Sequence, residues 1–587
     1  MIAGIDLGTT NSLIGIWRDG RAQLAGNALG ETLLPSVVSF DEDGTVYVGQ
    51  TARERLVTHP DTTFAEFKRD MGSSMRYTAH GKTYTPIDLS AIVLKQLKAD
   101  AEAYFGEEIT EAIISVPAYF DDKQRAATRN AGLLAGLKVS RLINEPSAAA
   151  LSYHIDHMEE SETYVVFDFG GGTLDATVVE TFSNVIEIRT ISGDNRLGGK
   201  DFNELIVQDM CKQNGPAYTS LTPGEQALML RVAEEIKILL TDQPEAAKTY
   251  RLRDKTYEYR LDEQHLIDIS SDLFRRLTIV LKRLMNDAEV SMEDIAGVIL
   301  VGGSSKMPIV RHFVGSLFPG KLMPHTNPDE IVARGAASFA GIKERREGVK
   351  DMVLIDVCPF TLGVTVVDDR MAPVLPKNTS LPASREEYFH TVFDDQRVVR
   401  IEVRQGEHMR ASENLLLDEI TINIPPLPRG RVGFIVRYSY DINGIFDVDI
   451  MNPNFAVDVH RKMGDTGGLS EEEVSERQKS LNALKIHPRD AEENRYLIAR
   501  ALRLYEECNP AQRVALEREL ALFDAALDTQ DPRVVNKSYI RFLAVLSRLE
   551  QTMFAFSDYD ADMWSEYLNE QTGVTDEAVA YGEDADD

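Results

Sequence analysis

GIDLGTTN, residues Gly4 to Asn11, decides the fold of this 587-residue chain. An apolar run stops at Asp6, turns at Gly8 and resumes from Ser12 to Trp17, which predicts two strands joined by a tight turn. A glycine lets the backbone approach a ligand closely, and the N–H groups of such a turn can cradle phosphate oxygens. The segment therefore predicts a phosphate site, although a plain hairpin remains open as the alternative.

An echo of this segment occurs later in the chain. VFDFGGGTLDATVVE, residues Val166 to Glu180, repeats the plan of apolar strand, aspartate, glycine turn, threonine and second strand. This turn leads into a strand and not into a helix, which distinguishes it from a Rossmann turn, and the sequence has no G-x-x-x-x-G-K-[ST] P-loop. We therefore expect two related lobes that face each other.

A third glycine-rich turn, VGGSSKMP at Val301 to Pro308, follows an apolar run and precedes a helical one. Backbone N–H groups at the start of a helix accept anions. Each turn alone fits a purely structural role. Three of them at strand ends, together with Asp6, Asp168 and Asp175, favour a nucleotide-phosphate and Mg²⁺ site.

The composition is that of an acidic, globular, multidomain protein. Hydrophobic residues make up 43% and charged residues 27%, and the length predicts about three or four folding units. A formal net charge of −31 disfavours nucleic acid and anionic membranes as partners. No stretch reaches the roughly 18 consecutive apolar residues of a membrane span, the first residues lack a targeting pattern, and three distant cysteines fit a reducing compartment. We expect a cytoplasmic protein.

The chain divides into segments of different pattern. Residues 1–347 alternate short apolar runs with helical stretches, which predicts an α/β domain with buried strands. Residues 348–356 place charges around a short apolar run and are interpreted as an interdomain linker, with the first strand of the next domain as the alternative. Residues 357–468 alternate apolar and polar positions and contain an Asn443-Gly444 turn, so they predict a compact antiparallel β-domain.

The last segments are helical and then acidic. A capping box at Ser470 to Glu473 and the pairs Asn509-Pro510 and Asp531-Pro532 mark helix starts, and they predict a short helical bundle over residues 469–556. Residues 557–587 carry acidic charges without Lys or Arg and predict a disordered tail.

Together these motifs give the chain a family resemblance. From about Met1 to Phe556 it resembles the DnaK-type chaperones of the seventy-kilodalton heat shock protein family (heat shock protein 70). The motifs, in family order, are GIDLGTTNS, ISVPAYF, RLINEPSAAALSY, FDFGGGTLD, GDNRLGGKDF, VGGSSKMP and NPDEIVARGAA. The short C-terminal region with NALKIHPRD, residues 482–490, is most similar to the HscC branch.

The resemblance implies an actin-like ATPase domain, which is a duplicated ribonuclease H-like α/β fold, followed by a β-sandwich peptide-binding domain and a short helical lid. The cleft of the ATPase domain would bind ATP or ADP with Mg²⁺, and K⁺ is a further candidate ion. By motif, Asp6, Asp168 and Asp175 would hold the hydrated metal, while Lys68 would orient the phosphates and Glu145 would lie near the attacking water. Without the motifs, Lys68 and Glu145 would be an ordinary surface lysine and a helix-start carboxylate.

Two further residue sets follow from the resemblance. The residues that would wrap the phosphates are Gly8, Thr9, Thr10, Asn11, Gly170, Gly171, Gly172, Thr173, Gly198 and Gly199, of which Thr173 also belongs to the catalytic set. The residues that would contact the adenosine are Glu234, Lys237, Thr241, Gly302, Gly303, Ser304, Lys306 and Asp329. Lys306 departs from the family, where many members have an arginine stacked on adenine, so weaker nucleotide binding is expected.

The β-domain resembles a peptide-binding sandwich with an apolar channel for an extended segment. The residues that would line the channel are Val364, Val367, Phe389, Val392, Val399, Ile401 and Phe434, and plain sandwich core is the alternative for each. An abbreviated lid predicts loose closure and fast peptide exchange.

Coupling between the domains is also implied by the resemblance. Pro117 and Arg125 match positions that transmit the nucleotide state, although a strand-end turn and a helix-surface charge are alternatives. The positions that match the J-domain co-chaperone and linker contacts are Arg141, Asn144, Val353, Leu354 and Asp356. A nucleotide-exchange factor is a further candidate partner, and a monomer is expected.

The favoured function is an ATP-driven chaperone of the stress response that binds and releases apolar segments of unfolded proteins. A small-molecule kinase on the same fold is one alternative, because fold does not fix function. An actin-like filament protein is another. The attached linker, β-domain and helices argue against both.

Overall fold

The structure is a computed structural model of the chain. It describes residues 1–155, 157, 162–213, 215–323, 327–441, 446–452, 457–462, 492–528 and 532–553. The expected turn at Asn443-Gly444, the capping box at Ser470, the segment 482–490 and the acidic tail lie outside these residues.

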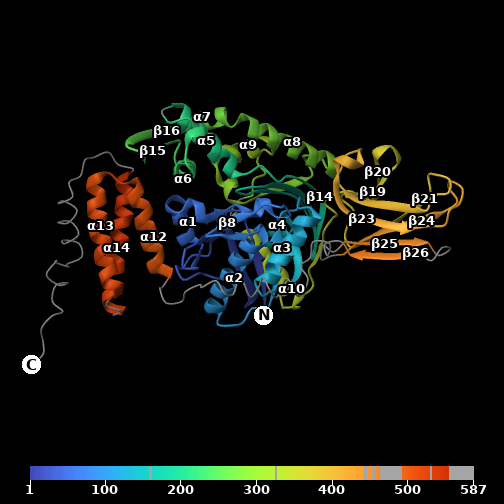
Figure 1. Ribbon diagram of the computed structural model, residues 1–587, viewed down its shortest axis with the longest axis horizontal. Helices are drawn as coiled ribbons and strands as arrows, with labels where there is room; N and C mark the ends of the chain where they lie inside the picture. The colour runs from blue at the N-terminus through green and yellow to red at the C-terminus, as the bar shows by residue number, and fades with distance from the viewer. Residues whose placement is uncertain are drawn as a thin grey trace, which may run out of the picture.

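Two sheets form the centre of the first part of the chain (Figure 1). The first has the strand order β11-β10-β1-β2-β3, with the short β4 paired to β2, and the second has the order β17-β12-β13-β14-β18. The strands of the first are β1 (Ile2–Asp6), β2 (Asn11–Arg18), β3 (Arg21–Leu24), β4 (Leu34–Pro35), β10 (Glu111–Val116) and β11 (Lys138–Asn144). Those of the second are β12 (Thr163–Phe169), β13 (Leu174–Phe182), β14 (Val185–Asp194), β17 (Ile295–Val301) and β18 (Val353–Ile355).

The internal echo read from the sequence corresponds to a repeated pairing pattern. β1 pairs antiparallel with β2 and parallel with β10, while β12 pairs antiparallel with β13 and parallel with β17. In both copies the glycine turn joins the two antiparallel strands. The chain therefore contains two similar lobes, each built on a strand–turn–strand unit.

Two helices, α4 (Glu145–Ile155) and α10 (Ile331–Lys343), pack between the sheets and join the lobes. Small residues make this close approach possible. A Cβ atom on Gly335 would lie 1.8 Å from the carbonyl oxygen of Ala148, and one on Gly4 would lie 2.0 Å from the backbone nitrogen of Ala337. Larger side chains at these glycines would separate the helices from each other and from β1.

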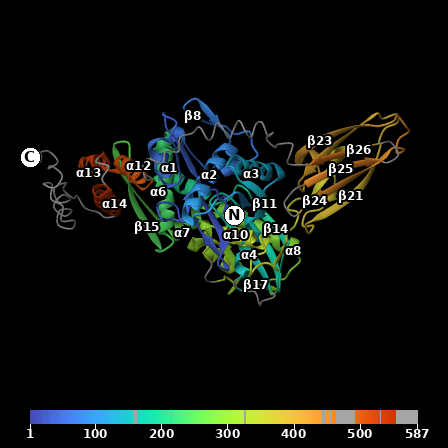
Figure 2. The ribbon, with the colours of Figure 1, turned by 90° about the horizontal axis from the view of Figure 1, so that it is seen from below.

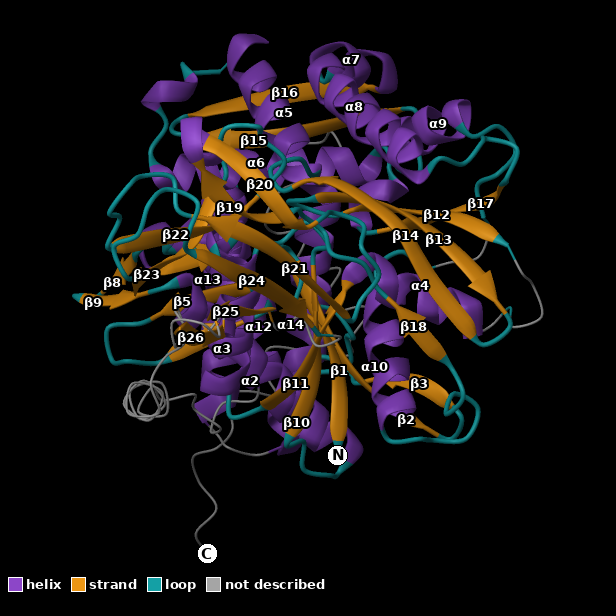
Figure 3. Cartoon of the chain, turned by 90° about the vertical axis from the view of Figure 1, so that its right-hand side faces the viewer, coloured by secondary structure: helices purple, strands orange, loops and turns teal. Residues whose placement is uncertain are grey.

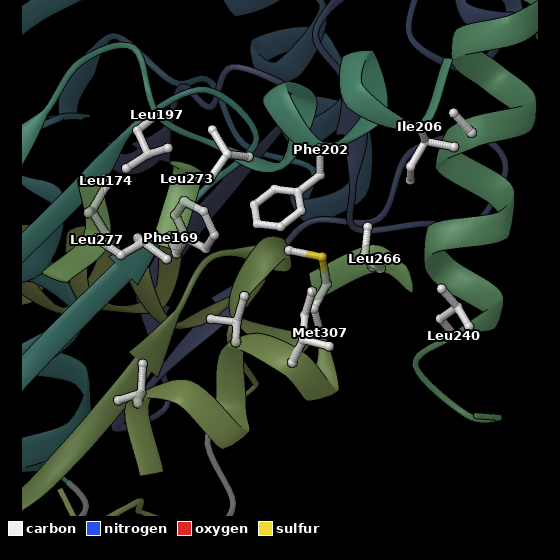
Figure 4. Packing of buried hydrophobic residues seen from close by; sticks show 14 of the residues in the cluster. Phe169, Leu174, Leu197, Phe202, Ile206, Leu240, Leu266, Leu273, Leu277 and Met307 are labelled. Atoms are coloured by element: carbon white, nitrogen blue, oxygen red, sulfur yellow. The ribbon is translucent and has the colours of Figure 1, made fainter. Parts of the chain in front are cut away.

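Further elements extend each lobe. In the first lobe they are β5 (Val37–Phe40), β6 (Val46–Val48), β7 (Thr63–Ala65), β8 (Tyr77–Ala79), β9 (Lys82–Tyr84), α1 (Gln50–Thr58), α2 (Pro86–Phe105), α3 (Asp122–Leu134) and the 3₁₀ turns Pro60–Thr62 and Phe67–Asp70. In the second they are β15 (Glu245–Leu252), β16 (Lys255–Asp262), α5 (Gly199–Gln213), α6 (Pro223–Leu239), α7 (Glu263–Ile269), α8 (Ser271–Ala288), α9 (Pro308–Leu317) and the 3₁₀ turns Tyr218–Ser220 and Gly303–Lys306. Phe169, Phe202 and Met307 belong to the buried cluster beneath the second and third glycine turns (Figure 4).

The following domain consists of two four-stranded antiparallel sheets, as the alternating sequence predicted. Their strand orders are β20-β19-β22-β23 and β21-β24-β25-β26, and Figure 3 looks toward them. The strands are β19 (Leu362–Val366), β20 (Arg370–Leu375), β21 (Ala383–His390), β22 (Val398–Gln405), β23 (Leu415–Asn423), β24 (Gly433–Tyr440), β25 (Phe446–Asn452) and β26 (Val457–Lys462), with 3₁₀ turns at Val367–Asp369 and Ala411–Glu413. Val399, Ile401 and Val403 are buried on one face of β22.

Three helices close the described chain: α12 (Glu492–Glu507), α13 (Pro510–Asp528) and α14 (Pro532–Met553). Their apolar faces form one buried cluster that includes Leu516, Phe523 and Phe542, as expected for a helical bundle. Figures 1 and 2 place this bundle beside α1 and β15, at the opposite end of the molecule from the β-domain. The bundle was expected to be a lid, but in this structure it does not cover the two β-sheets.

The alternative interpretation of the linker, as the first strand of the next domain, is wrong. Val353 to Ile355 form β18, which pairs parallel with β14 and so adds an edge strand to the second sheet of the preceding lobe. Leu354 packs against the buried cluster between the lobes, whereas Val353 is exposed. Among the described residues no helix is both long and apolar enough to cross a membrane.

Candidate functional site

A cavity of about 380 Å³ opens between the two lobes at the three glycine turns. Most of the predicted ATP-site residues line it. They are Asp6, Gly8, Thr9, Thr10, Asn11, Lys68, Glu145, Asp168, Gly170, Gly171, Thr173, Gly199, Glu234, Lys237, Thr241, Gly302, Gly303, Ser304, Lys306 and Asp329. Gly172 lies in the second turn, Asp175 lies in β13 just after it, and Gly198 directly precedes α5; none of the three lines the cavity.

The turns interlock because glycine lets their backbones meet. A Cβ atom on Gly171 would lie 2.0 Å from the Thr10 hydroxyl oxygen, so the first and second turns touch. The carbonyl oxygen of Gly170 accepts hydrogen bonds from the Ser304 hydroxyl at 2.8 Å and from the Gly199 N–H at 3.0 Å. The three turns that the sequence singled out therefore form one continuous surface.

A buried ion pair lies at the inner end of the cavity. The Lys68 ammonium is 2.6 Å from the Glu145 carboxylate, and both side chains are nearly inaccessible to water. Removing either partner would leave an uncompensated buried charge, which is strongly unfavourable. The pair therefore fixes a cation and an anion side by side where the lobes meet.

Three buried aspartates accompany this pair. Burial, together with the negative charge of Glu145, raises the pKa of Asp6 to about 7 and that of Asp175 to about 7, and it raises the pKa of Asp168 as well. The Ser115 hydroxyl donates to Asp6 at 2.7 Å and the Tyr119 N–H donates to Asp175 at 3.2 Å. A cation at this position would offset the mutual repulsion of the carboxylates.

The donor set fits a hydrated Mg²⁺ better than a metal bound directly by the protein. Among the described residues no group of three or more His, Cys, Asp or Glu side chains is placed to hold a metal ion. Mg²⁺ usually keeps several waters and takes one or two carboxylates plus phosphate oxygens. Asp6, Asp168 and Asp175 could meet such an ion through water.

The part of the cavity lined by Thr10, Lys200 and Lys237 suits an anion. The hydroxyl of Thr10 is buried without a hydrogen-bond partner in the described structure. Burial lowers the pKa of Lys200 to about 7 and that of Lys237 to about 8, so an anion beside them would favour their charged forms. An unpaired hydroxyl and two desolvated ammonium groups are suitable partners for phosphate oxygens.

The predicted adenosine residues that line the cavity make three polar contacts. Lys237 donates to the Gly199 carbonyl oxygen at 2.8 Å, and its neighbour Glu234 pairs with Arg53 of α1 at 2.8 Å. Lys306 forms an ion pair with Asp329. The predicted adenosine residues therefore lie together.

Sequence reasoning missed residues that lie directly beside its motifs. Lys200 and Asn203 line the cavity. Arg69 donates to the Gly172 carbonyl oxygen at 2.8 Å and to Asp201 at 3.0 Å, so it joins the first lobe to the second. Adjacency to Lys68 and to Gly199 was the only available signal, because the sequence does not state which residues face across the cleft.

Comparisons with known proteins agree with this geometry. The family model described as "Hsp70 protein" matches residues 2–79 and 73–501. The proteins named "Chaperone protein DnaK" of Thermotoga petrophila, Thermotoga maritima and Thermotoga neapolitana are each 39% identical to the chain over 490 residues, which is 81% of this chain and 82% of each relative. The chain belongs to the Hsp70 family. Hsp70 proteins are ATPases, and this Hsp70 is an ATP-dependent molecular chaperone.

Three of the predicted coupling residues of this Hsp70, Arg125, Asn144 and Asp356, form a buried hydrogen-bonded network. Arg125 of α3 donates to the Asn144 side-chain oxygen at 2.6 Å and to the Ala118 carbonyl oxygen at 3.1 Å. Asn144 in turn donates to Asp356, just after β18, at 2.9 Å. Arg125 is therefore buried and is not the surface charge considered as an alternative.

Arg141 lies close to this network. It is buried, its guanidinium carbon is 4.2 Å from the ring centre of Phe339, and burial lowers its pKa while Asp356 opposes that shift. Pro117 lies at the end of β10, and its carbonyl oxygen accepts from the Phe120 N–H at 3.1 Å. Arg125, Arg141, Asn144 and Asp356 thus lie close together where the first lobe meets the chain just after β18, whereas Val353 and Leu354 belong to β18 itself.

The β-domain of the Hsp70 packs against the same region. Tyr440 of β24 donates to Asp122 of α3 at 3.3 Å, and the Asp122 N–H donates to the Gln405 side chain at 3.3 Å. The rings of Tyr119 and Phe360 lie 4.5 Å apart. Because the Tyr119 N–H also donates to Asp175, one residue connects the buried aspartates beside the cavity with the β-domain.

The predicted channel residues fall into two groups. Val364, Val399, Ile401 and Phe434 are buried in the cluster between the two sheets, and Phe389 packs against it. Val392 is half-buried, and Val367 is 55% exposed. The described positions are those of core residues for the first group and of surface residues for Val367.

Proposed function

We propose that this Hsp70 uses ATP binding and hydrolysis between its lobes to control how its β-domain binds and releases exposed apolar segments of unfolded proteins. The observation that carries the proposal is the path from Asp175 through Tyr119 to Phe360, because it joins the buried aspartates beside the cavity to the β-domain through a single residue. Coupling of two sites requires a physical connection between two domain arrangements.

In the cleft, the three glycine turns bind the ATP phosphates through backbone N–H groups and the hydroxyls of Thr9, Thr10 and Thr173. Lys68 neutralises charge on the phosphates, and Glu145 holds Lys68 and orients the attacking water. These roles are expected because phosphoryl transfer depends mainly on the positioning of the reacting groups and on charge neutralisation. Asp6, Asp168 and Asp175 would hold Mg²⁺ through water, and the ion would supply further charge neutralisation.

At the other end of the nucleotide, Glu234, Lys237 and Thr241 contact the ribose and base, and Gly302, Gly303 and Ser304 contact the other side. Asp329 would lie beneath the base, and Lys306, its ion-pair partner, would lie beside the base. Their shared cavity supports these roles. K⁺ is proposed as an accessory ion beside the phosphates.

In the β-domain, an extended peptide gains main-chain hydrogen bonds and side-chain burial in an apolar channel. The seven predicted residues from Val364 to Phe434 line that channel in the peptide-bound arrangement. Five of them belong to or border one apolar cluster, which supports a contiguous apolar surface.

The linker transmits the nucleotide state of the cleft to the β-domain. β18 is an edge strand of the second lobe, and Asp356 behind it is bound by Asn144 and by the Ser147 hydroxyl at 3.1 Å. A J-domain co-chaperone meets Arg141, Asn144 and the linker, and it stimulates hydrolysis. Val353→Asp and Leu354→Asp variants therefore lose J-domain stimulation and keep basal ATP binding.

The domain boundaries proposed for this chain are 1–347 for the ATPase domain of actin-like fold, 348–356 for the linker, 357–468 for the peptide-binding domain, 469–556 for the helical lid and 557–587 for the acidic tail. The motif NALKIHPRD, residues 482–490, supports the proposed assignment to the HscC branch. We propose that the protein is a cytoplasmic monomer and that it also binds a nucleotide-exchange factor.

A peptide-stimulated ATPase assay tests the proposal. The full chain with Mg²⁺ and ATP should hydrolyse faster when an unfolded apolar peptide is added, and a Tyr119→Ala variant should lose that stimulation while it still binds ATP. Stimulation that persists undiminished in the variant would reject the proposed path. A protein that phosphorylates a small molecule, or that sediments as filaments with ATP, would support the alternatives.

A further inference from the structure

Lys200 is the second residue of α5 and lines the nucleotide cavity, although it belongs to none of the three glycine turns. Its backbone N–H donates to the carbonyl oxygen of Gly171 at 3.0 Å, so the second turn fixes its position. A Cβ atom on Gly171 would lie 2.0 Å from the Thr10 hydroxyl oxygen and 4.0 Å from the Cε atom of Lys200. The end of the Lys200 side chain therefore lies where the first and second turns meet.

The Lys200 ammonium forms an ion pair across the cleft with Glu66. Glu66 directly precedes the 3₁₀ turn Phe67–Asp70, which carries Lys68, so this pair connects the second lobe to the first. The Lys200 side chain is mostly buried, whereas that of Glu66 is 44% exposed. Because ion pairs at exposed sites contribute little free energy, Glu66 can exchange Lys200 for water at little cost.

The other lysines that line the cavity are Lys68, Lys237 and Lys306. The carboxylates paired with Lys68 and Lys306 are only 10% and 21% exposed, and Lys237 is held by a carbonyl oxygen of its own lobe. Of these cavity lysines, Lys200 has the most exposed ion-pair partner. Its ammonium is therefore the one that a bound anion can take over most easily.

Two polar atoms of this region are buried without a hydrogen-bond partner in the described part of the chain: the Thr10 hydroxyl oxygen and the side-chain oxygen of Asn203. Asn203 is a buried residue that lines the cavity. It lies three residues after Lys200 on α5, so the two side chains share one face of the helix. A lysine ammonium has three donors, so it can donate to the Asn203 oxygen and to a phosphate oxygen at once.

We propose that Lys200 is a phosphate-binding residue of this Hsp70, and that Glu66 and the phosphates of ADP or ATP compete for its ammonium. The phosphates win this competition because they carry more negative charge than one carboxylate. The cavity also screens charges less than the water around Glu66 does. Nucleotide binding therefore releases Glu66 and breaks one connection between the lobes. This inference rests on the proposed nucleotide site, to which it adds a residue that responds to the phosphates.

The test compares the affinities of the full chain for ADP and for adenosine, both measured by displacement of a fluorescent ADP. Lys200→Ala should weaken ADP binding at least about tenfold, because a hydrogen bond between two charged groups is lost. Adenosine has no phosphate, so its affinity should stay unchanged. Glu66→Gln should tighten ADP binding about threefold, because it removes the competing partner from an exposed pair. Lys212→Ala, at an exposed position in the last turn of α5, is the matched control and should change neither affinity.

The opposite effects of the two variants distinguish a phosphate contact from a structural ion pair. If the pair only held the lobes together, Lys200→Ala and Glu66→Gln would both weaken ADP binding, and the proposal would be overturned. Unchanged ADP binding in Lys200→Ala, or an equal loss of ADP and adenosine binding, would overturn it as well.

Glu66→Gln alters an exposed side chain, so it keeps the proposal testable even if Lys200→Ala fails to fold. Unchanged or weaker ADP binding in Glu66→Gln would show that Glu66 does not compete with the phosphates, and would overturn the proposal. Failure of the unaltered chain to bind ADP at all would instead overturn the proposed function itself.

Discussion

The side-chain amide of Asn144 donates a 2.9 Å hydrogen bond to the carboxylate of Asp356, and thereby ties the end of β11 in the first lobe to the chain just beyond β18 of the second. The same Asn144 side chain accepts from Arg125 at 2.6 Å. All three residues are buried. A change in the position of either lobe must therefore move or break this chain of contacts.

Replacement of Asn144 by Ala should uncouple the domains. In this variant the buried side chains of Arg125 and Asp356 each lose their hydrogen bond to Asn144. The loss should destabilise the domain arrangement that contains this network by about 1–3 kcal/mol. We expect stimulation of ATP hydrolysis by an apolar peptide to fall by at least about fivefold, while the ATP dissociation constant changes by less than about twofold. Single-turnover hydrolysis with and without peptide measures the first quantity, and calorimetry measures the second.

Ser147→Ala is the matched control, because it removes the 3.1 Å hydrogen bond from the Ser147 hydroxyl to the same Asp356 oxygen and leaves Asn144 in place. Its effect should be smaller. Equal stimulation in the unaltered chain and in Asn144→Ala would show that the network has no part in coupling.

Docking of the β-domain should depend on pH through Asp122. In the docked arrangement burial raises the pKa of Asp122 to about 6 from an ordinary 3.8. The positive charge of Arg125 opposes this rise, and the negative charge of Asp121 adds to it. The Tyr440 hydroxyl donates a hydrogen bond to the Asp122 carboxyl group. A carboxyl group whose pKa rises on docking binds protons more tightly in the docked state. The favourable contribution of Asp122 to the free energy of docking is therefore complete below about pH 4, and it is lost as pH rises through 6.

Energy transfer between labels on the ATPase domain and the β-domain should show a docked fraction that falls between pH 4 and pH 6. An Asp122→Asn variant, which cannot ionise, should show a flat profile over this range. Asp395→Asn removes an exposed carboxylate of the β-domain and should retain the pH dependence. A pH-dependent profile in Asp122→Asn as steep as in the unaltered chain would exclude Asp122 as the responsible group.

Much of the candidate site could be predicted from the sequence because its determinants are local. A glycine turn with an aspartate before it and a threonine within it is visible in a few consecutive residues, and the three turns each occur at a strand end, as expected. The antiparallel pairing of β22 with β23 follows equally from alternation, since Val399 and Ile401 have the period of two that a half-buried strand requires.

Other features depend on contacts between residues that are far apart in the sequence. The run Val353 to Ile355 predicts an extended segment, but only the fold reveals that its partner is β14. Arg69 and Asp201 are separated by 132 residues, and Arg503 and Glu54 by 449. Each of these charges looks like an ordinary surface residue in the sequence, and burial against a distant partner gives it a defined position.

Variants of the Lys68–Glu145 pair should affect protein stability and ATP hydrolysis separately. Lys68→Ala should slow ATP hydrolysis by about 100-fold or more, because a charge aimed at the transferred phosphate is lost from a water-poor site. It should also lower the free energy of unfolding by about 3 kcal/mol, since Glu145 is left buried and unpaired. Hydrolysis is followed as phosphate release, and unfolding by urea titration without nucleotide.

A double variant distinguishes the two effects. Lys68→Ala with Glu145→Gln removes the unpaired charge, so it should recover most of the lost stability while hydrolysis stays slow. If the double variant hydrolyses ATP at the rate of the unaltered chain, neither side chain acts on the phosphates.

Lys306 should limit the affinity for nucleotide. Its ammonium pairs with Asp329 at the cavity, but it lacks the planar guanidinium that can stack on an aromatic base. Lys306→Arg retains the positive charge beside Asp329 and adds a planar face, and a stacked cation contributes about 1 kcal/mol at a partly exposed site. We therefore expect the variant to bind ATP about fivefold more tightly in a calorimetric titration. Lys306→Gln, which keeps a polar side chain without charge, should bind no more tightly than the unaltered chain. An arginine variant with unchanged affinity would mean that the side chain at this position does not contact the base.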